Sequence, residues 1–303
     1  MTERTTDLFG PVASDLATIE KELLQEIDRD PPEVARSMAD LFQAGGKRIR
    51  PALVLLSALC GSYELDRLKP AAMAVEFTHA ATLVHDDVID RSATRRGRPT
   101  MAAALGDEPA IVIGDFYFAK AYEHASRTHV PEVVDILART VMSICAGEVR
   151  QQAIRYRYST DVEEYMQRIE AKTAMAGLAS QERAALSGYG RSLGLAFQIA
   201  DDVLDYTGAE GEVGKPIGHD IVEGFATLPL MLSSIKLEEG RRLDQQEAQR
   251  VADTVRNSDG PQLALALARD HANSARDQLT KLERNEATLA LDSLAEYVVS
   301  RKL

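Results

Sequence analysis

Two short acidic segments stand out in this sequence because each repeats aspartate at the spacing of one helical turn. The segments read DDVID at 86–90 and DDVLD at 201–205. Residues four apart share one face of a helix, so Asp86 with Asp90, and Asp201 with Asp205, would each form a pair of neighbouring carboxylates. Such a pair destabilises a helix unless a cation compensates for it, and the apolar residues around both segments make burial of the charges costly. The spacing therefore predicts two metal-binding faces.

The ligand type indicates which metal these faces would bind. Carboxylate oxygens without a nearby cysteine or a paired histidine favour Mg²⁺ over zinc. Mg²⁺ typically takes one or two carboxylates, keeps several waters and shares its other positions with substrate phosphates. An EF-hand is excluded because neither segment has its ligand spacing and central glycine. The simpler alternative, an exposed acidic turn, accounts for one segment more readily than for two.

Basic residues lie close to the first acidic segment and in one further patch. Arg95 and Arg96 follow the segment after a short break, and GGKRIRP at 45–51 carries Lys47, Arg48 and Arg50. Arginine can bind phosphate oxygens through two hydrogen bonds at once. The acids are therefore expected to bind metal and the arginines phosphate, although GGKRIRP alone is equally compatible with a solvated helix start.

These residues must be positioned by helices. Proline is absent from 71–98 and from 132–215, and apolar residues recur at helical rather than alternating spacing. The breaks, such as those at Gly61 and around Gly97, are short and do not have the composition of an interdomain linker. We therefore predict an all-α protein with a single helical domain over 1–303.

Composition limits the possible partners and location. Acidic residues outnumber basic ones 47 to 35, for a net charge of −12, which argues against broad nucleic-acid binding. The N-terminus lacks the features of a signal peptide, and the longest apolar run, at 51–61, is too short for a membrane span. A cytoplasmic location is expected. Cys60 and Cys145 lie among apolar residues, so both are predicted to be buried thiols.

Taken together, four motifs resemble those of the trans-isoprenyl diphosphate synthases, or polyprenyl synthetases. They are GGKRIRP, HDDVID followed by RRGRPT, the KTA triplet at 172–174, and FQIADDVLDY leading into GKPIGHD. The resemblance implies a helical bundle around a central, elongated apolar cavity, with the two aspartate motifs facing each other across its mouth. It also implies an allylic diphosphate and isopentenyl diphosphate as substrates, three Mg²⁺ ions in the substrate complex, and a homodimer.

The resemblance also assigns roles residue by residue. The main metal ligands would be Asp86, Asp90 and Asp201, with Asp87, Asp202 and Asp205 acting through water or through other residues. The allylic diphosphate would be held by Arg95, Lys172 and Lys215. Isopentenyl diphosphate would be held by Lys47, Arg50, His79 and Arg96. Oxygens facing the carbocation would come from Thr173 and Gln198. His85 is expected to be structural.

Product length is expected to depend on the helix that precedes Asp86. Family members that stop early have an aromatic residue four or five positions before the first aspartate, where this chain has Ala81 and Thr82. Together with Thr78, these small residues predict a product longer than fifteen carbons, in the range of thirty to forty. Candidates for the floor of the cavity are Phe77, Tyr117, Phe118 and Tyr122, although core packing explains such aromatics equally well.

Two departures from the family pattern keep other readings open. Phe225 stands where the family has a second lysine, and only 25 residues separate Lys172 from Gln198, so one helical hairpin must be shortened. The alternatives are a subunit of a heteromeric synthase with little activity alone and a geranylgeranyl diphosphate synthase. A phosphohydrolase built on His85 and Asp86 would need further histidines as metal ligands. A terpene cyclase would have no use for GGKRIRP. A purely structural role would not explain the matched acidic and basic patches.

Overall fold

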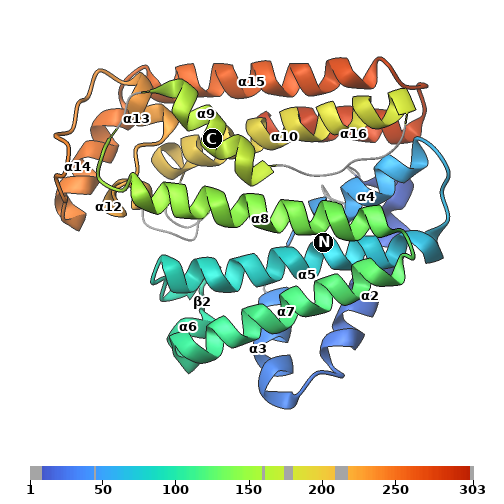
Figure 1. Ribbon diagram of the computed structural model, residues 1–303. Coiled ribbons are helices and arrows are strands. Elements are labelled where there is room, and N and C mark those ends of the chain that lie inside the picture. Colours follow the sequence, from blue (N-terminus) through green and yellow to red (C-terminus); the bar gives the residue numbers. More distant parts are fainter. Residues whose placement is uncertain (1–8, 44–45, 159–160, 174–179, 209–217, 301–303) are drawn as a thin grey trace. The chain divides into compact units, whose positions relative to one another are not determined.

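The computed structural model describes residues 9–43, 46–158, 161–173, 180–208 and 218–300. In these residues the regular secondary structure is helical apart from one small two-stranded ribbon (Figure 1). The all-α prediction is therefore confirmed. The residues divide into two compact units, one of 1–138 with 283–291 and one of 139–282 with 292–303. The single domain over 1–303 stays a prediction. None of the helices in the described ranges has both the length and the apolar character needed to cross a membrane.

The first unit contains the N-terminal helices and the ribbon. Its elements are η1 (Gly10–Val12), α2 (Ala13–Ile27), α3 (Pro32–Gln43), α4 (Ile49–Leu59), α5 (Leu65–Ile89), β1 (Thr94–Arg95), β2 (Arg98–Pro99), α6 (Met101–Leu105) and α7 (Asp107–Arg127). The two strands are antiparallel and pair Thr94 with Pro99 and Arg95 with Arg98. The sequence predicted only a break there, because two-residue strands are too short to show an alternating pattern.

The second unit contains the C-terminal helices. Its elements are α9 (Val162–Thr173), α10 (Ser180–Thr207), α12 (His219–Val222), α13 (Leu228–Leu232), α14 (Gln245–Arg256) and α15 (Gly260–Leu279). Two more helices, α8 (Pro131–Ala153) and α16 (Glu286–Ser300), have residues in both units. α10 and α15 run side by side (Figure 1). A buried alanine row on α15, which includes Ala264, Ala268 and Ala272, allows this close approach.

In the first unit, α5 and α7 lie side by side (Figure 1). Phe77 of α5 is fully buried and packs against Tyr117 and His124 of α7, with ring centroids 5.6 and 5.3 Å apart. Eight residues further along α5, the His85 ring lies 5.5 Å from Phe118, and its Nε2 lies 3.1 Å from the Ile111 carbonyl oxygen. This row of contacts fixes the rotation of α5, and it gives His85 the structural position that we expected.

The two cysteines differ in exposure. Cys60 is partly buried and lies within hydrogen-bond distance of the Leu56 carbonyl, but Cys145 on α8 is exposed. The prediction that both thiols are buried is therefore wrong for Cys145. The residues next to it in the sequence are apolar, but its own face of the helix also carries Met142 and Val149, whose side chains are exposed as well. Apolar neighbours in sequence did not reveal which side of α8 is covered.

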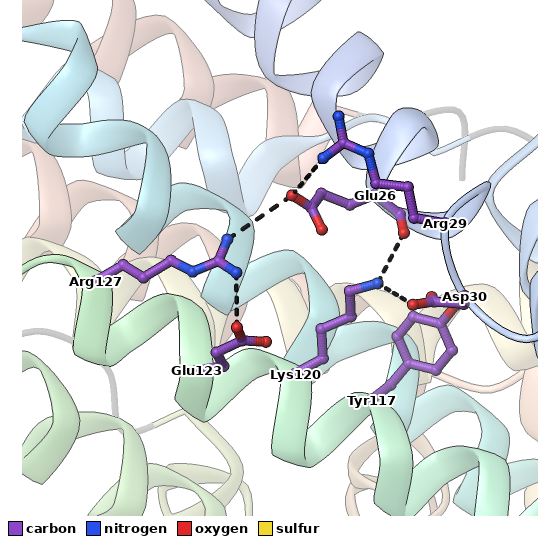
Figure 2. A network of polar contacts seen from close by, with 7 residues as sticks. All are labelled: Glu26, Arg29, Asp30, Tyr117, Lys120, Glu123 and Arg127. Atoms are coloured by element: carbon purple, nitrogen blue, oxygen red, sulfur yellow. Dashed lines mark hydrogen bonds and ion pairs between the residues drawn. The ribbon is translucent and has the colours of Figure 1, made fainter.

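A polar network ties α7 to the end of α2 (Figure 2). Lys120 donates to Asp30 and to the Glu26 carbonyl, 2.9 Å away, and Tyr117 donates to Asp30 across 2.8 Å. The side chains of Lys120 and Asp30 are both only 8% exposed. At the margin of the same network, Arg29 pairs with Glu26, but the Arg29 side chain is 71% exposed. The buried pair should therefore matter much more for stability than the exposed pair.

We predict that Lys120→Met lowers the free energy of unfolding by about 3–5 kcal/mol, because it leaves the Asp30 carboxylate buried without its cation. The matched control is Arg29→Ala, which removes an exposed pair and should cost less than about 1 kcal/mol. Chemical denaturation followed by circular dichroism would measure both. Equal losses in the two variants would contradict this account of the network.

Candidate functional site

The first acidic segment lies at the carboxyl end of α5. The helix ends at Ile89, and the Asp90 amide donates to the Asp86 carbonyl across 2.8 Å, so the two aspartates are one turn apart as predicted. Asp86 and Asp90 are partly exposed, whereas Asp87 is buried. The carboxyl end of a helix carries partial negative charge, so carboxylates are disfavoured there. This position increases the need for cations around the segment.

Arg95 supplies one of these cations. Its Nε lies 3.0 and 3.1 Å from the two carboxylate oxygens of Asp87, and its Nη2 lies 2.9 Å from Oδ1. The sequence predicted Arg95 as a ligand of the allylic diphosphate and Asp87 as a residue acting through others. The structure places two of the three guanidinium nitrogens of Arg95 on Asp87, which therefore orients this arginine.

The ribbon after α5 places Arg96 in a tight turn. Arg96 and Gly97, the two residues between the strands, have φ values of 52° and 75°, as a two-residue hairpin turn of type I′ requires. A side chain in this left-handed region costs about 1 kcal/mol. Thr100 anchors the base of the ribbon by donating to the Ser92 carbonyl across 2.6 Å. The turn holds the Arg96 backbone in a conformation that arginine rarely adopts.

His79 lies among the arginines that the sequence predicted to bind diphosphate. Burial, followed by the positive charges of Arg50, Arg95, Arg96 and Arg48, holds the pKa of His79 well below its usual range. Burial, followed by Arg95 and Arg48, also lowers the pKa of Arg96. The first unit thus brings four arginines and a neutral histidine together. An anion bound among them would offset the positive field and favour protonation of His79.

Lys47 lies in the same basic loop but faces solvent. It is exposed, Arg50 is partly exposed, and Arg48 between them is buried. Gly45, the first glycine of the motif, lies outside the described residues. The structure therefore brings Arg50, Arg96 and His79 together and places Lys47 at the exposed edge of the loop.

The second acidic segment lies near the carboxyl end of α10. Asp201 and Asp205 are partly exposed, and Asp202 is buried. Asp202 accepts hydrogen bonds from the Tyr165 hydroxyl at 2.6 Å and from Gln198 Nε2 at 2.9 Å. Burial, and next the charge of Asp220, raise the pKa of Asp202 to about 7. The Gln198 amide nitrogen is thus directed to Asp202, and the role of the Gln198 oxygen in facing the carbocation stays a prediction.

Asp220 belongs to this acidic group, and our sequence analysis gave it no role. Its amide lies 3.4 Å from Asp205 Oδ2, and the Gly218 amide donates to the Asp205 carbonyl across 3.1 Å. The turn before α12 thus returns to the end of α10. The only sequence signal was the aspartate at the end of GKPIGHD, and no helical spacing connects it with Asp205.

Three of the predicted site residues cannot be placed as side chains. Lys172 and Thr173 form the last two residues of α9, but their side chains lie outside the described part of the chain, as does all of Lys215. The two aspartate motifs, which are predicted to face each other, belong to different units. Their facing each other stays a prediction.

The residues predicted to control product length lie on two faces of α5. Thr78 and Thr82 are in line with Asp86, whereas Ala81 shares the face of Phe77 and His85 that packs on α7. The Thr78 hydroxyl donates to the Ala74 carbonyl and the Thr82 hydroxyl to the His79 carbonyl, each across 2.8 Å. With both hydroxyls directed to the backbone, the threonine row presents mainly methyl groups.

Phe225, which stands where the family has a second lysine, lies next to an arginine of the second unit. The Phe225 ring is buried, and the Arg155 guanidinium carbon lies 5.8 Å from its centroid. Arg155 also pairs with the Glu223 carboxylate and donates to the Glu223 carbonyl. A positive charge therefore lies next to the position of the missing lysine, although a carboxylate of the protein already pairs with it.

The acidic residues suit a metal ion whose coordination shell is completed by the substrate. Among the residues that the structure describes, no group of three or more histidine, cysteine or acidic side chains is arranged to hold a metal ion by itself. Each acidic segment instead offers two partly exposed carboxylates one turn apart. Mg²⁺ needs only one or two carboxylates when water and phosphate complete its shell. The donor set therefore fits Mg²⁺ bound together with a diphosphate.

Comparisons with known proteins agree with these features. The family model described as polyprenyl synthetase matches residues 31–259. The chain is 36% identical to heptaprenyl diphosphate synthase component 2 of Geobacillus stearothermophilus, over 97% of this chain and 98% of the relative. It is 34% identical to a short chain isoprenyl diphosphate synthase of Methanothermobacter thermautotrophicus, over 91% of this chain and 92% of the relative.

A solved structure shows the same similarity in three dimensions. The polyprenyl synthase of Caulobacter crescentus, complexed with calcium and isoprenyl diphosphate, superposes with a TM-score of 0.91 at 34% identity, covering 99% of this chain and 98% of that one. The family match spans both acidic segments and the basic loop between 45 and 51. The chain therefore belongs to the polyprenyl synthetase family.

Proposed function

We propose that this protein condenses an allylic diphosphate with isopentenyl diphosphate, head to tail and in trans, in a reaction that depends on Mg²⁺. The observation that carries the proposal is the group of Arg50, Arg95, Arg96 and His79 beside the Asp86–Asp90 segment. The positive charges of these arginines repel one another, so gathering them at one place costs free energy even in a protein with a net charge of −12. A diphosphate ligand would turn that repulsion into binding.

The first step is loss of diphosphate from the allylic substrate. We assign Asp86, Asp90 and Asp201 as carboxylates that bind Mg²⁺ together with the substrate. Arg95, Lys172 and Lys215 would hold the diphosphate and stabilise the charge that develops on it. When bound, Mg²⁺ neutralises negative charge on the leaving group. Three ions per active site remain the expected number.

The second step joins the two substrates. Lys47, Arg50, Arg96 and His79 would hold isopentenyl diphosphate so that its double bond attacks the allylic cation, and this positioning lowers the barrier. The oxygens of Thr173 and Gln198 would face the cation. We assign no side chain as the base; the departing diphosphate would take the proton, and an allylic diphosphate five carbons longer results.

We further propose a product longer than fifteen carbons, in the range of thirty to forty. The methyl groups of Thr78 and Thr82 in line with Asp86 support this length, as does the similarity to a heptaprenyl synthase component. Phe77 and Tyr117, both fully buried, pack against each other between α5 and α7, on another face of α5 than the threonine row, so core packing accounts for them. A geranylgeranyl product is the shorter alternative, and the short chain relative is compatible with it.

We propose a homodimer that forms through α7. Exposed apolar side chains occur at helical spacing on this helix, where Val112 is 65% and Phe116 is 37% exposed, and such a face is typical of helix packing between subunits. The alternative is a heteromeric synthase with little activity alone, which the name of the Geobacillus relative favours. The cytoplasmic location also stays a prediction, which cell fractionation would check.

The purified chain should make a polyprenyl diphosphate from farnesyl and isopentenyl diphosphates in magnesium buffer, and Asp86→Asn should lower kcat at least about a hundredfold. The control is Asp66→Asn, at the exposed start of the same helix, which should leave kcat unchanged. Turnover would be followed with labelled isopentenyl diphosphate. Full activity of Asp86→Asn would contradict the assigned role, and an inactive wild type would favour the heteromeric alternative.

Thr82→Phe should shorten the main product by at least one five-carbon unit, because the ring would block the row that leads from Asp86 along α5. Thr82→Val has nearly the shape of the native residue and should leave product length unchanged. Mass spectrometry of the extracted products would compare the two variants. If both give the wild-type product, the tail does not follow this row.

Val112→Glu should weaken dimerisation roughly tenfold or more, because it places a charge in an apolar contact. Leu263→Glu, at an exposed apolar position of α15, should leave the dimer intact. Sedimentation equilibrium would measure both dissociation constants. A wild-type protein that remains monomeric at micromolar concentration would overturn the proposed homodimer.

A further inference from the structure

Arg48 differs from the other basic residues of the GGKRIRP motif because it is buried. It is 8% exposed, whereas Lys47 faces solvent and Arg50 is partly exposed. It caps the start of α4 with φ 48° and ψ 32°, in the left-handed region. A residue with a side chain is strained in this conformation, which persists only where surrounding contacts enforce it.

The Arg48 side chain makes those contacts with groups of the protein. Its Nη1 lies 2.8 Å from Glu76 Oε1, its Nε 3.1 Å from Glu20 Oε1, and its Nη2 3.0 Å from the Phe42 carbonyl oxygen. The guanidinium also stacks over the Phe42 ring at 5.1 Å. All three nitrogens thus have protein partners, so binding substrate would require Arg48 to give up contacts that enforce its conformation.

Glu76 is the counterpart of Arg48 on α5. It is 5% exposed and precedes His79 by three residues, so the two lie on neighbouring positions of one helix face. The charge of Glu76 also acts on Arg96. A buried carboxylate between two arginines reduces their repulsion, and its fixed place on α5 links the basic loop to the helix that carries His79 and Asp86.

Gly46 brings the loop into close contact with the same arginines. A Cβ atom at this position would lie 2.9 Å from Arg48 Nη1 and 3.7 Å from Arg96 Nη1. A side chain at this position would push against Arg48 Nη1, which its contact with Glu76 holds in place. The loop backbone, the Arg48 side chain and the end of Arg96 therefore form one packed assembly.

We propose that Arg48, held by Glu76, is a positioning residue that sets Lys47, Arg50 and Arg96 for isopentenyl diphosphate without contacting the substrate itself. This inference rests on the proposed function. Loss of the pair would let the loop relax, while Arg95, which is assigned to the allylic diphosphate, keeps its contacts with Asp87. The effect should therefore fall on one substrate and not on the other.

The test compares Glu76→Ala with the wild type in steady-state kinetics. The KM for isopentenyl diphosphate should rise about tenfold, with the KM for farnesyl diphosphate changed less than about twofold and kcat less than about threefold. Glu76→Gln keeps the hydrogen-bonding shape without the charge, so it should show a smaller rise in the same KM. It also provides the test if Glu76→Ala does not fold.

A control variant removes another ion pair of α5, which joins this helix to α2. Lys69 of α5 lies 2.8 Å from Glu22 of α2, and their side chains are 22% and 34% exposed, so Glu22→Ala breaks a more exposed ion pair of the same helix away from the basic loop. It should leave both KM values unchanged. An equal rise in both KM values for Glu76→Ala, or the same kinetics in Glu76→Ala and Glu22→Ala, would show a merely structural role and overturn the proposal.

Calorimetry separates this inference from the proposed function. Isopentenyl diphosphate alone should bind the wild type and should bind both Glu76 variants more weakly. If the wild type binds none, the proposed function fails. If the wild type and the Glu76 variants bind equally well, the proposed function stands and the positioning role is wrong.

Discussion

The compensation of like charges is the physical constraint on which this structure depends. Three aspartates lie at the carboxyl end of α5, where the partial charge of the helix disfavours negative charge. Beside them, the positive charges of four arginines act on His79 and, with burial, lower its pKa. Neither group is favourable alone. The protein satisfies part of each internally, through Arg95 with Asp87 and Arg48 with Glu76, and leaves carboxylates at Asp86 and Asp90 partly exposed.

The internal pairs also divide the motif residues into two kinds. Buried members such as Asp87, Arg48 and Asp202 make the protein contacts described above, and partly exposed members such as Asp86, Arg50 and Asp201 lie one or two residues away in the sequence. A helix or tight loop alternates its side chains between the core and the surface over such short distances. The buried charged residues of a motif can therefore hold its partly exposed charged residues in place. This explains why charged residues occur in runs.

Much of this could be predicted from the sequence, since it depends on local spacing. The helical spacing of Asp86 and Asp90 and the break after Asp90 both follow from neighbouring residues. Asp220 could not be found in this way, because a turn of the chain brings it to Asp205. The exposure of Cys145 was also missed, since burial depends on which face of α8 its neighbours cover. The pair of Arg95 with Asp87 depends on a hairpin whose strands are too short to leave a pattern.

The central claim is that carboxylates and diphosphate bind Mg²⁺ together, each completing the site for the other. The most direct measurement is a calorimetric titration of the protein with Mg²⁺ in the absence and presence of inorganic pyrophosphate. Because the described residues contain no self-sufficient metal cluster, Mg²⁺ alone should bind weakly and should bind much more tightly with pyrophosphate, with reciprocal coupling. Equally tight binding of Mg²⁺ with and without pyrophosphate would contradict this claim.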